Sequence, residues 1–543
     1  MKGDTAIARI LKAEGVEFIT CFPYNTLIDT AAEEGIRTIL TRTERVAVNI
    51  ADGFTRASYG QRNGVCTMQS GPGIENAFSG VALAYGDSVP ILVLPGGHER
   101  YRLVPPNFIA RDNYRNITKW VDLVNSADRI PDLMRRAFSY LRTGRPGPVM
   151  LEIPRDVSQE EFNDRMFQYS PVKGVKTSGD PADVRDVAKA LIAAKNPVIR
   201  AGLGVLYACA WNELQELAEL LQCPVFTTMC GKSAFPENHR LSLGTGGYSR
   251  TEMVKHFLDK ADLVFAIGSS CTKELFTMPI PDGKVIMQST IDERDINKDY
   301  PVAHAIIGDA KLVLRQLIEE VQHKIGSKGK KGSDTVAREV KVVKDKWLKE
   351  WMPKLTSDEI PINPYRVIGD MMRVLDSKKT IVTHDAGYPR DQILPFYESV
   401  VPGGYIGWGK STTLGSSLGL SMGARLARPD KTCVSFMGDA AFGMVGMDFE
   451  TAVREKIPVL TILLNNSRLG GYQKRHPIAS EKYNLNVVSG NYSVIAEGCG
   501  GYTERVEQPK DIIPALKRAK EANDSGNPAL LEIITQDETS IHQ

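Results

Sequence analysis

Short apolar runs alternate with longer amphipathic stretches throughout the chain. In the amphipathic stretches apolar residues return every three or four positions, a spacing that predicts helices. The short runs end at glycine, proline or polar residues, which predicts buried strands. In the first 165 residues they lie at 18–21, 38–41, 64–68, 90–94 and 148–153. This alternation predicts a parallel sheet covered by helices on both faces.

The same alternation returns twice more along the chain. Between residues 180 and 325 the apolar runs lie at 197–202, 224–228, 262–268 and 284–287. After a long charged helix predicted over 336–354, they continue from 380–383 to 528–534. We therefore expect an α/β protein of three consecutive doubly wound parallel-sheet domains, at 1–165, 180–325 and 340–543.

Two polar stretches separate the predicted domains. Residues 155–179 are mixed and polar, and residues 326–333 are rich in glycine, serine and lysine. Both predict linkers, and we interpret the second as a solvated flexible hinge rather than as a basic binding patch.

Composition excludes several classes of protein. Charged residues make up 24% and hydrophobic residues 42%, and the net charge is +2, so no nucleic-acid or membrane partner is expected. The eight cysteines form no Cys-x-x-Cys pair and are interpreted as small buried hydrophobic residues of a reducing compartment. No apolar run reaches the roughly 18 residues that span a membrane. The chain opens directly into a helical pattern without a signal peptide, so a cytoplasmic enzyme is expected.

One predicted strand–helix–strand unit carries polar groups at both strand ends. The run 433–438 is followed by Asp439, and the run 458–464 is followed by Asn465 and Asn466. A crossover places the carboxyl ends of both strands at one edge of the sheet, so Asp439 and Asn466 should be neighbours. Their oxygen atoms, with the N-terminus of the intervening helix, suit a magnesium ion that bridges the protein to a diphosphate. An ordinary unit with polar loops is the alternative, and the spacing of the two ends favours the site.

This pattern resembles the thiamine diphosphate binding motif, in which Gly-Asp is followed about thirty residues later by Asn-Asn. Ala440 stands where that motif usually has glycine. The order of the three predicted domains is similar to the pyruvate decarboxylase and acetolactate synthase branch of thiamine diphosphate enzymes, over nearly the whole chain. The resemblance implies that the first domain binds the pyrimidine ring and the third the diphosphate, and that the central domain is structural. It also implies a homodimer or homotetramer.

Glu44 is the candidate for activating the cofactor. It lies at the start of a predicted helix and is followed by Ala-Asp-Gly-Phe-Thr-Arg at 51–56, similar to the family's glutamate motif. The resemblance implies that its carboxyl group bonds the pyrimidine nitrogen and favours the imino form that takes the proton from the thiazolium ring. The alternative is a capping box formed by Thr41 and Glu44.

Other segments resemble cofactor-binding parts of the family. The stretch 70–76 is similar to its Gly-Pro-Gly-x-x-Asn turn. In the stretch 408–425, Leu414 matches the apolar wedge that bends the cofactor, and Thr412 matches a backbone carbonyl that accepts from its amino group. The loop at 384–387 is similar to the Asp-x-Gly loop near the diphosphate, but Tyr388 and Pro389 replace the Gln-His that follows in acetolactate synthases.

The resemblance implies two sets of site residues. The cofactor residues are Glu44, Pro72, Asn76, Gly387, Thr412, Leu414, Gly438, Asp439, Ala440, Ala441, Asn466, Leu469 and Gly470. The metal ligands are Asp439, Asn466 and the carbonyl of Arg468.

The substrate pocket is less defined by sequence. Asn25 occupies the place of a family glycine loop, where its amide could orient a substrate carboxylate as a catalytic residue or cap the following helix. Residues 466–477 lack the element with which acetolactate synthases choose the acceptor. Residues 241–248 begin their flavin-associated pattern without its remainder, so FAD is doubtful as a cofactor, and so is acetolactate as the product.

Three hypotheses follow. The first is a thiamine diphosphate- and magnesium-dependent carboligase that decarboxylates a 2-oxo acid, similar to acetolactate synthase. The second is a simple decarboxylase, or a lyase acting on an acyl-CoA or a sulfonated aldehyde. The third is a binding or regulatory protein without turnover.

Overall fold

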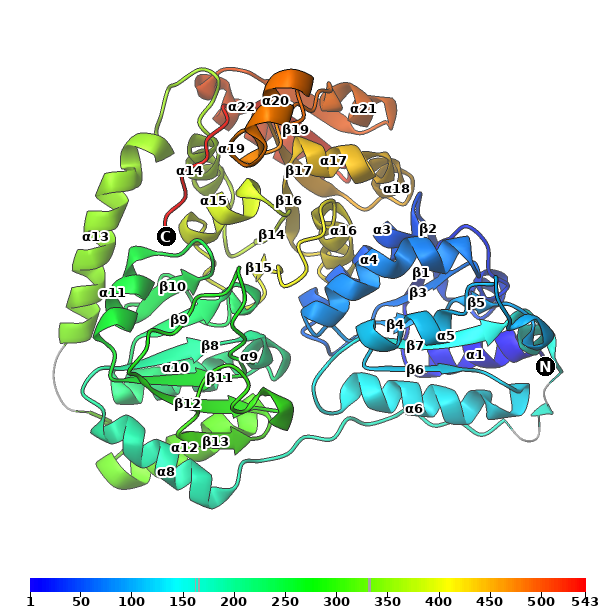
Figure 1. Ribbon diagram of the computed structural model, residues 1–543, viewed down its shortest axis with the longest axis horizontal. Coiled ribbons are helices and arrows are strands. Elements are labelled where there is room, and N and C mark those ends of the chain that lie inside the picture. The colour runs from blue at the N-terminus through cyan, green and yellow to red at the C-terminus, as the bar shows by residue number, and fades with distance from the viewer. Residues whose placement is uncertain (162, 165–166, 331–333) are drawn as a thin grey trace.

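The computed structural model describes residues 1–161, 163–164, 167–330 and 334–543. It contains three β-sheets that follow one another along the chain, and every named strand pair in the described residues is parallel. In Figure 1 the N-terminal unit lies at the right in blue and cyan, the central unit at the lower left in green, and the C-terminal unit at the top in yellow to red. The predicted fold class is confirmed.

The N-terminal unit is built on a sheet with the strand order β2-β1-β3-β4-β7-β5, with β6 also paired to β7. Its strands are β1 (Phe18–Phe22), β2 (Arg37–Leu40), β3 (Val65–Met68), β4 (Leu92–Val93), β5 (Gly96–Gly97), β6 (Trp120–Leu123) and β7 (Val149–Pro154). Its α-helices are α1 (Gly3–Ala13), α2 (Leu27–Glu33), α3 (Glu44–Ala57), α4 (Pro72–Gly86), α5 (Ala110–Asn113), α6 (Ile130–Arg142) and α7 (Arg155–Gln159).

The central unit has the strand order β10-β9-β8-β11-β12-β13. From β8 the chain runs outward through β9 and β10, and it then returns to β11 and runs outward on the other side of the sheet. The order of the strands reverses between β8 and β11, which opens a crevice at their carboxyl ends. Its strands are β8 (Pro197–Ala201), β9 (Val225–Thr228), β10 (Ser242–Gly246), β11 (Leu263–Ile267), β12 (Val285–Thr290) and β13 (His304–Ile307). Its α-helices are α8 (Pro181–Ala193), α9 (Leu203–Tyr207), α10 (Trp211–Leu221), α11 (Glu252–Lys260) and α12 (Ala310–Ile325).

The C-terminal unit has the strand order β15-β14-β16-β17-β19-β18. Its strands are β14 (Thr380–His384), β15 (Tyr405–Ile406), β16 (Thr432–Gly438), β17 (Val459–Asn465), β18 (Tyr502–Val506) and β19 (Ala529–Ile534). Its α-helices are α13 (Thr335–Leu355), α14 (Pro364–Val374), α15 (Tyr388–Phe396), α16 (Ser417–Ala427), α17 (Asp439–Val445), α18 (Phe449–Arg454), α19 (Tyr472–Arg475), α20 (Pro477–Tyr483), α21 (Tyr492–Gly498) and α22 (Ile512–Asp524).

The apolar runs predicted from sequence correspond to strands in all three units, and six further strands were not predicted. These are β5, β6, β10, β13, β15 and β18. They are short, glycine-rich or only partly buried, so they lack the continuous apolar signal of the central strands.

The two predicted linkers are partly structured. The first begins with α7, because Arg155 to Gln159 form a helical turn that buries Val157. In the second, the N–H of Lys330 donates to the carbonyl of Leu220, and Gly329 lies so close that a Cβ there would be 2.3 Å from the same oxygen. Residues 331–333 lie outside the described residues, and the described start of this segment is packed against α10 rather than free.

The N-terminal and C-terminal units meet along α3 and α16. A Cβ at Gly53 would lie 2.1 Å from the carbonyl oxygen of Leu420, and one at Gly423 would lie 2.0 Å from that of Ile50. The two backbones therefore touch, and only glycine permits this approach. As a result, the start of α3 is held at a fixed place relative to the C-terminal unit.

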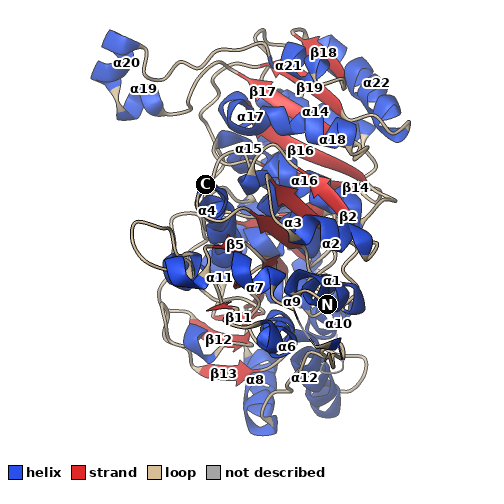
Figure 2. Cartoon of the chain, turned by 90° about the vertical axis from the view of Figure 1, so that its right-hand side faces the viewer, coloured by secondary structure: helices blue, strands red, loops and turns tan. Residues whose placement is uncertain are grey.

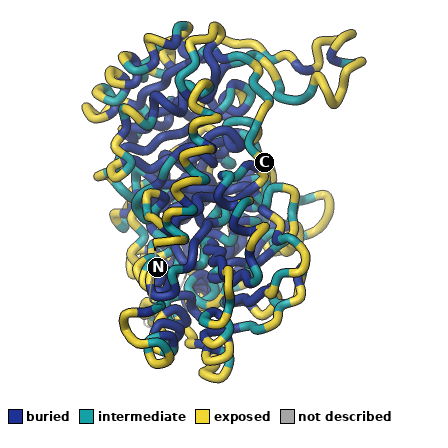
Figure 3. Tube along the Cα trace, turned by 90° about the vertical axis from the view of Figure 1, so that its left-hand side faces the viewer, coloured by how far each residue is buried: buried dark blue, intermediate teal, exposed yellow. Residues whose placement is uncertain are grey.

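One segment projects from the body. Helices α19 and α20 form an arm that extends away from the C-terminal unit (Figure 2), and the arm is mostly exposed (Figure 3). The arm follows directly on the polar loop after β17.

Candidate functional site

Asp439 and Asn466 lie together at the carboxyl edge of the C-terminal sheet. Strands β16 and β17 are parallel neighbours, with Gly438 opposite Leu464. The backbone N–H of Ser467 donates to Oδ2 of Asp439 at 2.7 Å, which joins the two strand ends. The predicted neighbourhood of the two residues is confirmed, and their role as ligands stays a prediction.

The carboxylate of Asp439 is buried without a counter-ion. Asp439 is only 3% exposed. Among the described residues, no cationic side chain forms an ion pair with its carboxylate. Burial raises its pKa to about 6, although the N–H groups of Ala440, Ser467 and Asn466 lower it in part. A buried carboxylate in this condition is suited to a cation that arrives from outside the chain.

The loop after β17 is fixed by its own polar groups. Oδ1 of Asn466 accepts from the N–H of Arg468 at 3.0 Å, and Ser467 has a positive φ of 56°. The N–H of Leu469 then donates to the carbonyl of Asn486. This turn places the Asn466 side chain and the Arg468 backbone in one short loop beside Asp439.

Tyr388 and Pro389 join this loop to the loop that follows β14. A Cβ at Gly470 would lie 2.2 Å from Cδ2 of Tyr388, so the ring lies against the backbone of Gly470. A Cβ at Gly438 would lie 3.5 Å from Pro389. The two residues that depart from the acetolactate synthase pattern therefore lie against both halves of the predicted diphosphate site.

Asp385 holds the segment that carries the predicted wedge. Its buried carboxylate accepts from the N–H groups of Gly415 and Ser417, both at 2.9 Å. Leu414 is half-buried and packs against a small apolar cluster that includes Trp408. The sequence analysis placed residues 384–387 near the diphosphate. It did not predict that Asp385 accepts hydrogen bonds from the segment of Leu414, because these partners lie about thirty residues further along the chain.

Glu44 is the first residue of α3 and is buried, with 4% exposure. Nδ2 of Asn76 donates to its Oε2 at 3.4 Å, and Gly73 lies beside its other oxygen. Burial raises the pKa of Glu44. The capping-box alternative is wrong, because the hydroxyl of Thr43, and not that of Thr41, accepts from the N–H of Val46.

The two halves of the candidate site approach each other around Gly415 within the chain. A Cβ at Gly415 would lie 2.9 Å from Nη2 of Arg45 and 3.2 Å from the carbonyl oxygen of Ala441. Asp448 accepts from the N–H of Arg42 and from the hydroxyl of Thr43, which ties the start of α3 to the C-terminal unit. Within the described ranges, however, no hydrogen bond or ion pair links Glu44 to Asp439 or to the loop after β17.

Asn25 uses its amide inside the N-terminal unit. Its oxygen accepts from the N–H of Leu27 at the start of α2, and its nitrogen donates to the carbonyl of Met68. The geometry therefore favours the helix-capping interpretation over the orientation of a substrate, and a catalytic role for Asn25 stays a prediction.

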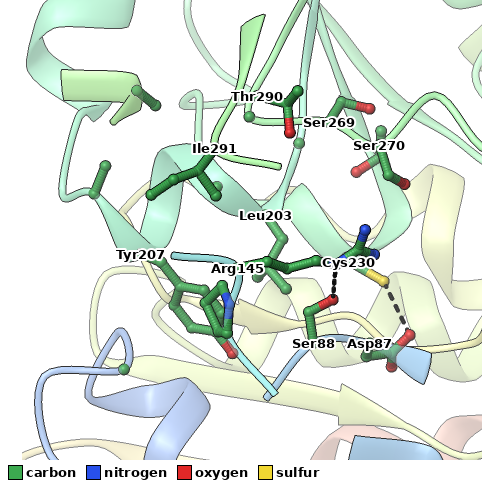
Figure 4. Close-up of a pocket in the computed structure, with 18 of the residues that line it drawn as sticks. Asp87, Ser88, Arg145, Leu203, Tyr207, Cys230, Ser269, Ser270, Thr290 and Ile291 are labelled. Atoms are coloured by element: carbon green, nitrogen blue, oxygen red, sulfur yellow. Dashed lines mark hydrogen bonds between the residues drawn. The ribbon is translucent and has the colours of Figure 1, made fainter. Parts of the chain in front are cut away.

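A cavity of about 400 Å³ lies where the three units meet. Figure 4 shows Ser269, Ser270 and Thr290 of the central unit on one side and Asp87 and Ser88 of the N-terminal unit on the other. Sequence reasoning missed this cavity. The available signal was a set of glycines that line it: Gly202, Gly246, Gly268 and Gly308 at the ends of the central strands, and Gly204 in α9.

Arg200 is the unusual cation of this cavity. It is 2% exposed, and Nη1 donates to the carbonyl of Met278 at 3.2 Å. Its Nε has no partner, and it forms no ion pair in the described part of the chain. In contrast, Arg145 pairs with Asp292 and Asp295 at the same cavity. The cavity is thus lined by both cationic and acidic side chains, and the expectation that FAD is doubtful stays a prediction.

Within the ranges that the structure describes, no three histidine, cysteine or acidic side chains gather in a metal-binding cluster. In those ranges no helix combines the length and the apolar character required to cross a membrane.

Three protein-family descriptions match the chain. Residues 1–120 match the thiamine pyrophosphate enzyme N-terminal TPP binding domain, residues 184–317 the central domain, and residues 385–533 the C-terminal TPP binding domain. Each match lies on one of the three sheet units.

Curated relatives match over nearly the full length. The chain is 32% identical to a probable acetolactate synthase large subunit of Methanocaldococcus jannaschii, covering 98% of this chain and 92% of the relative. It is 31% identical to a protein of the same description from Methanococcus aeolicus, covering 96% and 90%. It is 28% identical to the acetolactate synthase isozyme 3 large subunit of Escherichia coli, covering 96% and 92%.

Proposed function

The chain belongs to the thiamine pyrophosphate enzyme family as a carbon–carbon bond-forming enzyme similar to acetolactate synthase, and we propose that its reaction needs magnesium and a 2-oxo acid. The acid is decarboxylated, and the remaining acyl unit is transferred to an acceptor carbonyl. We place the domain boundaries where the sequence pattern changes, at 1–165, 180–325 and 340–543.

The observation that carries this proposal is the buried, unpaired carboxylate of Asp439 beside the loop of Asn466. A carboxylate, an amide oxygen and a backbone carbonyl are hard oxygen donors of the kind that Mg²⁺ prefers. Asp439, Asn466 and the carbonyl of Arg468 would hold the ion. The missing counter-ion of Asp439 and the convergence of both strand ends fit such a group.

Backbone near this edge would hold the diphosphate. Gly438 ends β16 without a side chain, and Gly387 precedes α15 with a φ of 85°, whereas the Cβ side of Gly470 is occupied by the ring of Tyr388. The proposed set of cofactor residues is unchanged from the sequence analysis: Glu44, Pro72, Asn76, Gly387, Thr412, Leu414, Gly438, Asp439, Ala440, Ala441, Asn466, Leu469 and Gly470.

Glu44 is proposed as the group that exchanges a proton with the cofactor. When bound, thiamine diphosphate supplies the electron sink that decarboxylation requires. Burial raises the pKa of Glu44, so its carboxyl group retains a proton at a higher pH than an exposed glutamate does. Asn76 orients this carboxyl group through one oxygen and leaves the other available.

We propose that the complete site forms between two copies of the chain. Within one chain the start of α3 already lies near α17, so the proposed role of the partner is to cover the exposed side of the site. Large apolar side chains are exposed on both units: Phe78 and Tyr85 on α4, Met444 on α17, and Met447 directly after α17. Exposed apolar surface of this kind is typical of an interface between proteins.

The test is a product assay. Purified protein with pyruvate, thiamine diphosphate and Mg²⁺ should release carbon dioxide and form acetolactate. Failure to release carbon dioxide from any member of a panel of 2-oxo acids would end the proposal.

A simple decarboxylase or another lyase is the second candidate. The ring of Tyr388 and the absence of the acceptor element after Asn466 favour it, because both alter the surroundings of the site. It predicts an aldehyde as the only organic product, without a new carbon–carbon bond.

A further inference from the structure

Tyr388 lies between the two loops that carry the proposed metal ligands. It is the first residue of α15, directly after the loop that ends β14. Its ring lies so close to Gly470 that a Cβ at that position would be 2.2 Å from Cδ2 and 2.4 Å from Cε2. The next residue, Pro389, lies in ordinary contact distance of Gly438, which directly precedes Asp439.

Glycine is required at the other side of this contact. Any side chain at Gly470 would overlap the ring, and Gly471 adopts a φ of 78° that favours glycine. The two glycines thus leave their backbone uncovered by side chains, and the planar ring of Tyr388 packs against it. This contact accounts for the two glycines that follow Leu469.

The loop needs support at this position. Its first part is fixed by the bonds of Ser467 to Asp439, of Arg468 to Asn466 and of Leu469 to Asn486. Beyond Gly470 the chain enters the exposed arm of α19 and α20 (Figure 2). The contact of Gly470 with Tyr388 therefore lies between the loop of Asn466 and Arg468 and the exposed arm.

The ring rather than the hydroxyl makes the contact. The Tyr388 hydroxyl forms no hydrogen bond with any residue in the described ranges, and its ring is half-buried. A phenylalanine could therefore make the same contact with Gly470.

We propose that Tyr388 is a positioning residue whose ring holds Gly470, and through it the loop of Asn466 and Arg468, beside Asp439. The proposal rests on the proposed function, because it assigns to this loop the binding of a magnesium ion. Tyr388 then replaces by packing the polar groups that the neighbouring positions of acetolactate synthases provide.

The test is calorimetric titration of metal-free protein with Mg²⁺ and thiamine diphosphate. Tyr388→Ala should weaken the apparent Mg²⁺ affinity about ten- to hundredfold, the effect typical of residues that orient metal ligands. Tyr388→Phe should remain within about twofold of the wild type. Tyr483→Ala, at the exposed end of the arm, is the matched control and should leave the affinity unchanged.

A double-mutant cycle with Gly470 tests the contact itself. Gly470→Ala should weaken Mg²⁺ affinity in the wild-type chain, where the new methyl group overlaps the ring. In the Tyr388→Ala background the same substitution should cost little further affinity, because the ring is absent. At saturating Mg²⁺ and cofactor, kcat of Tyr388→Ala should return toward the wild-type value, since the residue acts only through position.

The outcomes separate this inference from the proposed function. Equal losses in Tyr388→Phe and Tyr388→Ala would overturn the inference, as would additive losses in the double mutant. A wild-type protein that binds neither Mg²⁺ nor thiamine diphosphate would instead overturn the proposed function on which the inference depends. Circular dichroism of each variant establishes that a loss of affinity is not a loss of folding.

Discussion

Two buried carboxyl groups, Glu44 and Asp439, carry the proposed chemistry. Neither forms an ion pair among the described residues, and burial raises the pKa of both. Some other buried carboxylates have a cationic partner, as Asp52 has Arg56, whereas Asp385 and Asp448 are held by N–H and hydroxyl donors. Buried acids without such a partner concentrate at functional sites, because the desolvation cost is tolerated only where a ligand or a proton is needed.

Glu44→Gln should abolish most of the activity while the protein stays folded. The amide has the same shape but cannot exchange a proton, so we expect turnover to fall about 10²- to 10⁴-fold. Glu75→Gln makes the same chemical change at an exposed position of α4 and should leave turnover intact. Near-normal carbon dioxide release by the Glu44 variant would remove this residue from the mechanism.

Magnesium binding should depend on pH through Asp439. Because its pKa is about 6, roughly a tenth of the carboxyl groups are ionised at pH 5 and nine tenths at pH 7. A metal ion needs the ionised form, so Mg²⁺ affinity should rise about tenfold from pH 5 to pH 7 and then level off. Calorimetric titration at pH 5, 6 and 7 measures this directly.

The raised pKa of Asp439 also makes the stability of the folded protein depend on pH. The pKa of Asp439 in the folded chain exceeds its ordinary value of 3.8, so the folded state binds the proton more tightly. Its contribution to the stability of the metal-free protein is complete below about pH 4 and is lost as pH rises through about 6. Saturating Mg²⁺ should reverse this loss, and Asp439→Asn should remove both effects.

At the scale of elements, the contact of α3 with α16 decides where Glu44 lies. Glycines on both helices allow their backbones to touch, and Asp448 fixes the first turn of α3. Sequence periodicity predicts each helix but contains no record of this contact, because the two helices are separated by hundreds of residues.

Gly423→Ala should lower the melting temperature by several degrees. A Cβ at this position would lie 2.0 Å from the carbonyl of Ile50, and overpacking of this kind costs about 1–3 kcal/mol. Gly498→Ala is the matched control, because no atom lies within 4 Å of a Cβ placed there, at the end of α21. Scanning calorimetry measures the melting temperature of both variants. An unchanged melting temperature of Gly423→Ala would mean that α3 and α16 can move apart without a loss of stability.

At the scale of the whole molecule, each chain presents two exposed apolar surfaces beside the candidate site. We expect a dimer in which the N-terminal unit of one copy faces the C-terminal unit of the other. The exposed surfaces on α4 and beside α17 are then buried together, which also explains why they are apolar.

Replacement of both Met444 and Met447 by lysine should disrupt the dimer and the activity together. The two side chains are 56% and 57% exposed in the single chain, and charged groups in a buried interface are unfavourable. Val342→Lys, on the exposed face of α13, is the control at a position that is 68% exposed. Light scattering coupled to size exclusion reports the mass, and a monomer with full activity would contradict the shared site.

Local sequence determined the sheet units and the Asp439–Asn466 pair. Burial of a strand or helix face imposes a short apolar period, and the constant handedness of parallel crossovers then brings both strand ends to one edge. The start of the helix at Glu44 was also readable, although Thr43 rather than Thr41 caps it.

Only the tertiary structure decided how distant segments meet. It brought the Tyr388 ring to Gly470, directed Asp385 to Gly415 and Ser417, left Arg200 without a counter-ion, and packed α3 on α16. These contacts depend on the shapes and charges of side chains that are far apart along the chain. Periodicity reports whether a residue is buried, whereas packing in three dimensions decides which residue it is buried against.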